Sequence, residues 1–148
     1  MTGELVVDAS VVLKWLVDEP DVAWARRVAT SSYVLIAPDL LHSEVANALW
    51  RIRRKGLLSE RQHFELYDRL SDFNLQFLVL EHPLHAASLA LATRLDHPVY
   101  DCLYLALALA RGAALATADT RFARAIRRAD ALPDRLVLTP PEAASPPA

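Results

Sequence analysis

The sequence has little of what holds a small secreted domain together. One cysteine, Cys102, stands among 148 residues, so no disulfide can form within the chain. It lies in the apolar run CLYLALALA, which indicates a small buried side chain in a protein of a reducing compartment. A chain of this length buries roughly two-thirds of its unfolded surface, so neither a disulfide nor a metal is needed for folding.

Long hydrophobic runs are also missing. The longest apolar stretch, residues 102–110, falls far short of the ~20 residues that cross a bilayer. The first residues lead directly into a strand pattern, without the basic and apolar segments of a signal peptide. We therefore expect a cytoplasmic protein that makes no contact with a membrane.

Neither sign of charge is in large excess. The 16 lysines and arginines nearly balance the 18 aspartates and glutamates, for a net charge of −2. Any binding of nucleic acid must therefore depend on where arginines are placed and not on the overall field. Hydrophobic residues, in contrast, make up 53% of the chain. This apolar surplus predicts a surface covered by a partner, and we expect a homodimer.

Short apolar segments alternate along the chain with segments of helical periodicity. The predicted strands are residues 5–7, 33–36, 76–80, 114–117 and 136–138. The predicted helices are residues 10–17, 22–29, 40–55, 59–74, 83–95, 100–111 and 121–129. The alternation predicts a three-layer α/β/α domain over residues 1–139, with a central parallel sheet of about five strands. Residues 140–148 are rich in proline and alanine and are expected to form a flexible tail.

Four acidic residues occupy positions from which such a fold would bring them together. Asp8 follows the first predicted strand and Asp119 the fourth. Asp101 opens a helix, and Glu44 lies at the margin of the apolar stripe of another. The carboxyl ends of parallel strands meet at one edge of a sheet, so we expect these side chains to converge there. Each also has a simpler explanation, as a helix cap for the aspartates or as a solvated or arginine-paired position for Glu44.

The joint pattern favours a metal site. Two carboxylates about 5 Å apart repel by roughly 3 kcal/mol at an effective dielectric near 20, so a cluster of them calls for a cation. Hard oxygen ligands without a cluster of cysteine or histidine favour Mg²⁺ or Mn²⁺ over Zn²⁺. His82 and His85 share a helical face, but no third nitrogen or sulfur ligand accompanies them. Because Mg²⁺ is commonly bound together with phosphate oxygens, a phosphodiester or phosphoryl substrate is expected.

The segments that carry the four acids also resemble a known family. VDASVVLKWL, HSEVANAL, YDCLYLALA and TADTRF are similar to the four acidic motifs of the PIN-domain ribonucleases, and most similar to the VapC-type toxins of bacterial toxin–antitoxin pairs. The resemblance implies a PIN-like sheet ordered 3-2-1-4-5. It also implies a catalytic Mg²⁺ or Mn²⁺ site held by Asp8, Glu44, Asp101 and Asp119, with supporting hydroxyls from Ser10 and Thr117.

The function implied by the resemblance is that of a type II toxin. Such an enzyme is an endoribonuclease that hydrolyses RNA phosphodiester bonds by a metal-activated water, leaving a 5′-phosphate and a 3′-hydroxyl. It would be held inactive by a cognate VapB-like antitoxin. An RNA-binding or scaffold PIN domain without activity is the alternative, and a phosphatase is a further one. The phosphatase is disfavoured because Ser10 stands where aspartate-nucleophile phosphatases have a second aspartate.

Basic residues near the acids are candidates for contacts with RNA phosphates. Arg51 and Arg54 fall on the same side of their helix as Glu44, and Arg121 lies two residues after Asp119. Lys14 lies on the first predicted helix, although a solvent-exposed position is the simpler expectation for it. For the arginines too, a solvated charged face is the alternative.

Overall fold

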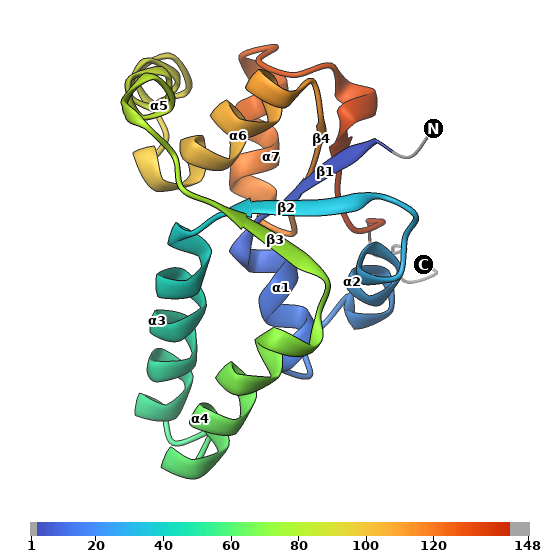
Figure 1. Cartoon of the computed structure of the whole chain (residues 1–148), viewed down its shortest axis with the longest axis vertical. Coiled ribbons are helices and arrows are strands. Elements are labelled where there is room, and N and C mark those ends of the chain that lie inside the picture. Colours follow the sequence, from blue (N-terminus) through green and yellow to red (C-terminus); the bar gives the residue numbers. More distant parts are fainter. Residues whose placement is uncertain (1–2, 143–148) are drawn as a thin grey trace, which may run out of the picture.

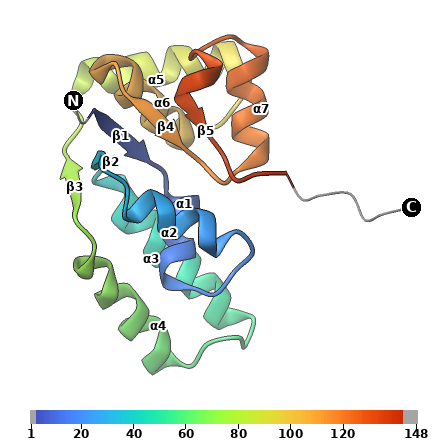
Figure 2. The same cartoon turned by 90° about the vertical axis from the view of Figure 1, so that its right-hand side faces the viewer.

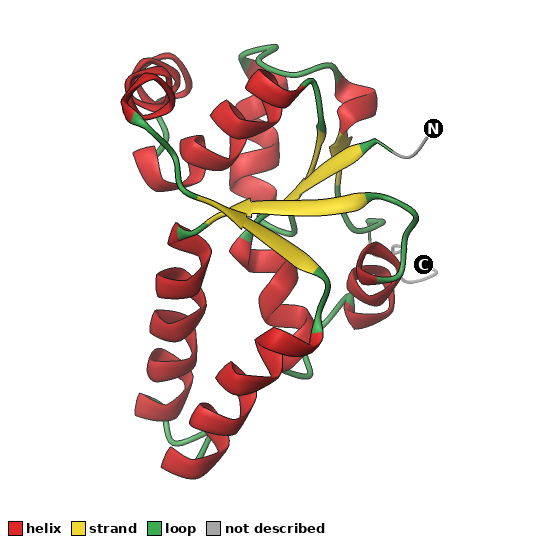
Figure 3. Ribbon diagram, viewed as in Figure 1, coloured by secondary structure: helices red, strands yellow, loops and turns green. Residues whose placement is uncertain are grey.

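A parallel sheet forms the centre of the computed structural model, which describes residues 3–142. Five strands within this range pair in the order β3-β2-β1-β4-β5, and every pair of neighbours is parallel (Figure 3). Their bounds are β1 Glu4–Val7, β2 Val34–Pro38, β3 Leu75–Leu78, β4 Ala114–Ala116 and β5 Val137–Leu138. The predicted fold class and strand order are confirmed.

Helices cover both faces of the sheet. The bounds are α1 Ala9–Leu16, α2 Val22–Ala29, α3 Leu40–Arg54, α4 Glu60–Asp68, α5 His82–Leu95, α6 Val99–Arg111 and α7 Thr120–Arg128. Helices α1 to α4 lie on one face and α5 to α7 on the other (Figures 1 and 2). This division follows from right-handed crossovers, because the chain moves outward from β1 to β3 and then returns to β4 and β5. None of the helices in residues 3–142 is both long and apolar enough to span a bilayer.

The core is built around β1 and α6. Leu5, Val6 and Val7 of β1 are all buried, as expected for a central strand covered on both faces. Helix α6 packs against β1, β2 and β4, and every residue from 102 to 108 is buried. Cys102 therefore occupies the core as predicted. Burial, with a further contribution from the charge of Asp101, raises the pKa of its thiol to about 11.

Helix α4 is shorter than its periodicity predicts. Ser59 and Gln62 form a reciprocal capping box at its start, as their spacing indicates. The helix ends at Asp68, and a 3₁₀ turn follows over Arg69–Asp72. The Ser71 hydroxyl donates to the carbonyl of Asp68 at 2.8 Å, and such local bonds compete with the helical hydrogen bonds. With α3, this helix forms a hairpin that extends away from the sheet (Figure 1).

Candidate metal centre

The ends of β1 and β4 bring Asp8 and Thr117 to one edge of the sheet. The backbone N–H of Asp8 donates to the carbonyl of Ala116 at 3.1 Å, which extends the pairing of the two strands by one residue. Asp119 follows two residues after Thr117, and its side chain caps α7. Strand pairing brings these residues together although they are far apart in the sequence, so the acids that follow β1 and β4 lie at one edge of the sheet.

Asp8 is a buried carboxylate. Its side chain is almost inaccessible and accepts hydrogen bonds from the backbone N–H of Ser10 at 2.9 Å, the N–H of Val11 at 3.4 Å and the Ser10 hydroxyl. Burial raises the pKa of Asp8 to about 7, the nearby charge of Asp101 adds to the rise, and hydrogen bonds from Ser10 and Thr117 oppose it. Asp8 therefore does cap α1, but burial of the carboxylate is a cost that an exposed cap would avoid.

Ser10 and Thr117 form a network between the two strand ends. The hydroxyl of Ser10 accepts a hydrogen bond from the backbone N–H of Ala118 at 2.9 Å and lies 3.5 Å from the hydroxyl of Thr117. The hydroxyl of Thr117 in turn accepts from the backbone N–H of Asp119 at 3.1 Å. The Ser10 hydroxyl thus ties the Asp8 carboxylate to the backbone after β4, and the Thr117 hydroxyl holds the backbone of Asp119.

Asp101 faces this edge from the first turn of α6. Its carboxylate lies 2.7 Å from the Nε2 atom of His97, and the His97 ring stacks on Phe122 of α7 at a centroid distance of 5.0 Å. His97, Asp101 and Asp119 each offer one ligand atom, and these three atoms lie within 4.8 Å of one another. Burial raises the pKa of Asp101, His97 lowers it, and the charge of Asp119 raises it.

Glu44 reaches the site from α3 and is held by Tyr104. The tyrosine hydroxyl donates to the Glu44 carboxylate at 2.7 Å. Burial raises the pKa of Glu44, the bond from Tyr104 lowers it, and the charge of Asp101 raises it. The pKa of Tyr104 is itself raised by burial and then by the charge of Glu44, so its hydroxyl keeps its proton and remains a donor.

His97 and Tyr104 were not among the residues that we predicted for this site. His97 lies four residues before Asp101, outside α6, which begins at Val99, and Tyr104 lies three residues after Asp101 on the same helix. His97 was missed because the pair His97-Pro98 indicates a break between helices. Tyr104 was missed because it lies in an apolar run, where a tyrosine is expected to pack in the core.

The electrostatics of the four acids centre on Asp101. The charge of Asp101 raises the pKa of Asp8 and of Glu44, and the charge of Asp119 raises the pKa of Asp101. The carboxylates are therefore close enough to repel one another in a partly buried site, and a divalent cation would reverse the sign of that interaction. The carboxylate oxygens fit Mg²⁺ or Mn²⁺, whereas the Nε2 atom of His97 is engaged by the Asp101 carboxylate.

The basic residues differ in their surroundings. Arg51, Arg54 and Arg121 are exposed. Lys14, by contrast, donates to the carbonyl of Pro20 at 2.8 Å and lies 3.6 Å from the Glu19 carboxylate, with 12% of its side chain exposed. These contacts occupy the ammonium group of Lys14, which is therefore less available to an RNA phosphate than the exposed arginines are.

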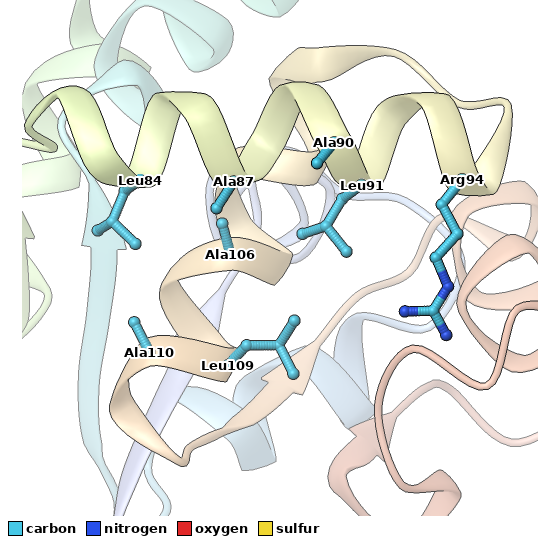
Figure 4. Close-up of a pocket in the computed structure, with 8 residues that line it drawn as sticks. All are labelled: Leu84, Ala87, Ala90, Leu91, Arg94, Ala106, Leu109 and Ala110. Carbon is cyan, nitrogen blue, oxygen red and sulfur yellow. The ribbon is translucent and has the colours of Figure 1, made fainter.

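An apolar cavity lies apart from the four acids. It is an apolar groove of about 510 Å³ between α5 and α6, and Leu84, Leu91 and Leu109 point into it (Figure 4). None of the four acids lines it, and Arg94 is the charged residue at its border. Its apolar lining offers few polar groups for orienting a substrate, so the carboxylate edge is the better candidate for chemistry.

Comparisons with known proteins agree with this architecture. A family model described as PIN domain matches residues 5–127, a range that contains all four acids. The chain is 37% identical to Ribonuclease VapC3 of Pyrobaculum aerophilum over 124 residues, covering 81% of this chain and 92% of that protein. It is 35% identical to Ribonuclease VapC1 of Mycobacterium tuberculosis over 125 residues, covering 82% and 90%.

A solved structure gives the same result for the fold. The crystal structure of PAE2754 from Pyrobaculum aerophilum superposes with a TM-score of 0.64 at 22% identity, covering 82% of this chain and 78% of that one. At this identity the likeness concerns the fold alone. The family match and the VapC relatives give the assignment: the chain belongs to the PIN-domain family, in its group of VapC-type ribonucleases.

Proposed function

We propose that this protein is a Mg²⁺- or Mn²⁺-dependent endoribonuclease that acts as the toxin of a type II toxin–antitoxin pair. Relatives that cover most of the chain are named ribonucleases of the VapC type. The observation that carries the proposal is the convergence of Asp8, Glu44 and Asp119 around Asp101, from four separate parts of the sequence. Such a group of partly buried acids is unfavourable without a cation, and metal-assisted hydrolysis gives it a use.

The four acids would hold the metal, which would activate water for attack on the phosphodiester and neutralise charge on the phosphate. Ser10 fixes the side chain of Asp8 and, with Thr117, the strand ends beside it. His97 and Tyr104 fix the carboxylates of Asp101 and Glu44 by hydrogen bonds.

Substrate contacts would come from the exposed arginines. Arg51 and Arg54 on α3 and Arg121 at the start of α7 lie on elements that also carry or directly follow the acids Glu44 and Asp119. Guanidinium groups at these positions would neutralise RNA phosphates beside the metal.

The partners follow from the proposed role. A VapB-like antitoxin would cover the acidic site, and by analogy with the family an arginine of the antitoxin could pair with the carboxylates. A homodimer in the cytoplasm would cover part of the apolar surface that the composition predicts.

The test is RNA cleavage by the purified protein. We expect cleavage with Mg²⁺ or Mn²⁺, none with EDTA, and none by Asp8→Asn or Asp119→Asn variants that remain folded by circular dichroism. Products should carry a 5′-phosphate. Metal-bound protein that binds RNA without cutting it would establish the scaffold alternative. Release of phosphate from an aryl phosphate, without RNA cleavage, would indicate a phosphatase. Cleavage that persists in both variants would refute the site.

A further inference from the structure

Two hollows join into one surface track that leads away from the carboxylates along α3. The first, of about 250 Å³, lies between α1 and α3 and includes Ser10, Glu44, Asn47 and Arg51 in its lining. The second, of about 480 Å³, continues along α3 and is lined by Asn47, Trp50, Arg51, Arg54 and Lys55. Asn47 and Arg51 line both hollows, so the two adjoin along α3.

We propose that this track binds single-stranded RNA beside the cleavage site, with an unpaired base stacked on Trp50. The inference rests on the proposed ribonuclease function and adds to it the surface along which the RNA strand lies and the residue on which a base stacks. The name α3 track is used below for the groove lined by Asn47, Trp50, Arg51, Arg54 and Lys55.

The cations of the track have no acidic partner. In residues 3–142, no carboxylate lies within ion-pair distance of Arg51, Arg54 or Lys55. Arg53, on the same helix, instead lies 3.8 Å from the carboxylate of Glu60 at the start of α4. The helix therefore directs one of its arginines to a neighbouring acid and leaves three positive charges on the face that leads from Glu44. Phosphate groups are the ligands that such a row of charges suits.

Trp50 supplies an aromatic surface on the same face. Its side chain is 47% exposed, although an indole ring gains much from burial. The guanidinium carbon of Arg54 lies 5.2 Å from the centre of the ring, within the range of a cation–π contact. An exposed indole beside unpaired arginines is the combination by which proteins bind single strands, since the ring stacks on bases and the charges contact the backbone.

The length of the track suits a few nucleotides. Arg51 lies seven residues after Glu44, a rise of about 10 Å along the helix, and Lys55 lies eleven residues after it, a rise of about 16 Å. In a duplex the bases are paired and stacked on one another, so no base face is available to Trp50. We therefore expect the track to prefer unpaired RNA over a duplex of the same sequence.

Binding should be measured separately from cleavage. The full-length protein in EDTA would be titrated with a fluorescently labelled single-stranded RNA of mixed sequence, and with the same strand annealed to its complement. We expect Trp50→Ala to weaken binding to the single strand about tenfold, and Trp50→Phe to retain most of the affinity. The double variant Arg51→Ala/Arg54→Ala should bind about tenfold more weakly. The slope of log affinity against log salt concentration should also fall by the amount expected for the loss of about two phosphate contacts.

Intrinsic fluorescence gives a second readout that a change in stability would not produce. Trp15 is buried and bonded to the carbonyl of Ala25, and Trp24 is half-buried on α2, outside the track, so quenching that depends on Trp50 can be assigned to the track. Quenching is expected in the wild type and should be lost in Trp50→Phe. The matched control is Arg26→Ala/Arg27→Ala, which removes two exposed arginines from α2 and should leave the affinity unchanged.

The outcomes separate this inference from the function that it extends. Single-strand binding that depends on Trp50 and the two arginines, without cleavage in Mg²⁺, would support the track and overturn the nuclease. Cleavage and binding that are both unaffected by Trp50→Ala and by the double arginine variant would overturn the track alone. Equal affinity for duplex and single strand would also contradict the proposal.

Discussion

The hydroxyl of Tyr104 on α6 donates a 2.7 Å hydrogen bond to the carboxylate of Glu44 on α3, sixty residues earlier in the chain. The two helices lie on opposite faces of the sheet (Figure 2). Because Tyr104 also lies three residues after Asp101, one helix carries one of the four acids and the donor that positions another. The arrangement of Glu44 relative to Asp101 is therefore fixed through α6.

Tyr104→Phe should weaken metal binding more than it weakens the fold. A hydrogen bond to a charged group contributes about 1.5–3 kcal/mol, and outer partners of metal ligands commonly affect affinity by tenfold or more. Since the bond from Tyr104 lowers the pKa of Glu44, its loss should raise that pKa, so the affinity lost relative to the wild type should be larger at pH 6 than at pH 8. Calorimetric titration with Mn²⁺ would measure this. Tyr100→Phe, at an exposed position one residue before Asp101, is the control. Equal losses at both pH values would contradict this role for Tyr104.

His97 should affect the metal site through Asp101. Its Nε2 atom lies 2.7 Å from the carboxylate, and Phe122 holds the ring by stacking. We expect His97→Ala to weaken Mn²⁺ binding about tenfold, and His97→Gln, which can still donate to the carboxylate, to recover part of the loss. Electron paramagnetic resonance of bound Mn²⁺ would report affinity and ligand environment together. His82→Gln changes an exposed histidine at the start of α5 and should have no effect. Indistinguishable spectra and affinities in His97→Ala would exclude the role.

The metal-free protein should become less stable as the pH rises from about 4 to about 7. In this window Asp8 is protonated in the folded state, where its pKa is about 7, but ionised in the unfolded chain. The folded state thus binds more protons, so its stability falls with rising pH; Glu44 and Asp101, whose pKa values are also raised, act in the same direction. Thermal unfolding in EDTA at pH 5.5 and pH 8 would show it.

Added metal should reverse this trend, because a cation binds the ionised carboxylates and competes with protons. Stabilisation by Mn²⁺ should therefore be larger at pH 8 than at pH 5.5. Asp8→Asn should raise the stability of the metal-free protein at pH 8 by roughly 1–3 kcal/mol, since it removes a buried charge, and should reduce the gain from Mn²⁺. A wild-type protein whose stability in EDTA rises with pH over this range would show that the acids are not desolvated.

The strands and the edge that carries the acids could be expected from the sequence pattern, and the strand order from the family resemblance, whereas the partners of those acids could not. Strands such as Leu5 to Val7 are short, apolar and followed at once by polar residues, so local pattern identifies both the strand and the residue at its end. Lys14 shows the limit of that approach. Its position near Asp8 suggested phosphate binding, but its actual partners, Glu19 and Pro20, depend on the turn after α1.

Asp119 allows the helix-cap role and the metal role to be separated. Its carboxylate accepts from the backbone N–H groups of Arg121 at 3.0 Å and Phe122 at 3.2 Å at the start of α7. Asparagine caps helices as well as aspartate does, whereas alanine costs about 1 kcal/mol. Asp119→Asn should therefore keep wild-type stability in EDTA and lose RNA cleavage, while Asp119→Ala should lose both cleavage and about 1 kcal/mol of unfolding free energy. Urea denaturation with a parallel cleavage assay would measure the two effects. If Asp119→Asn cleaved RNA normally, capping would be the whole role of this residue, and the metal site would have to be drawn without it.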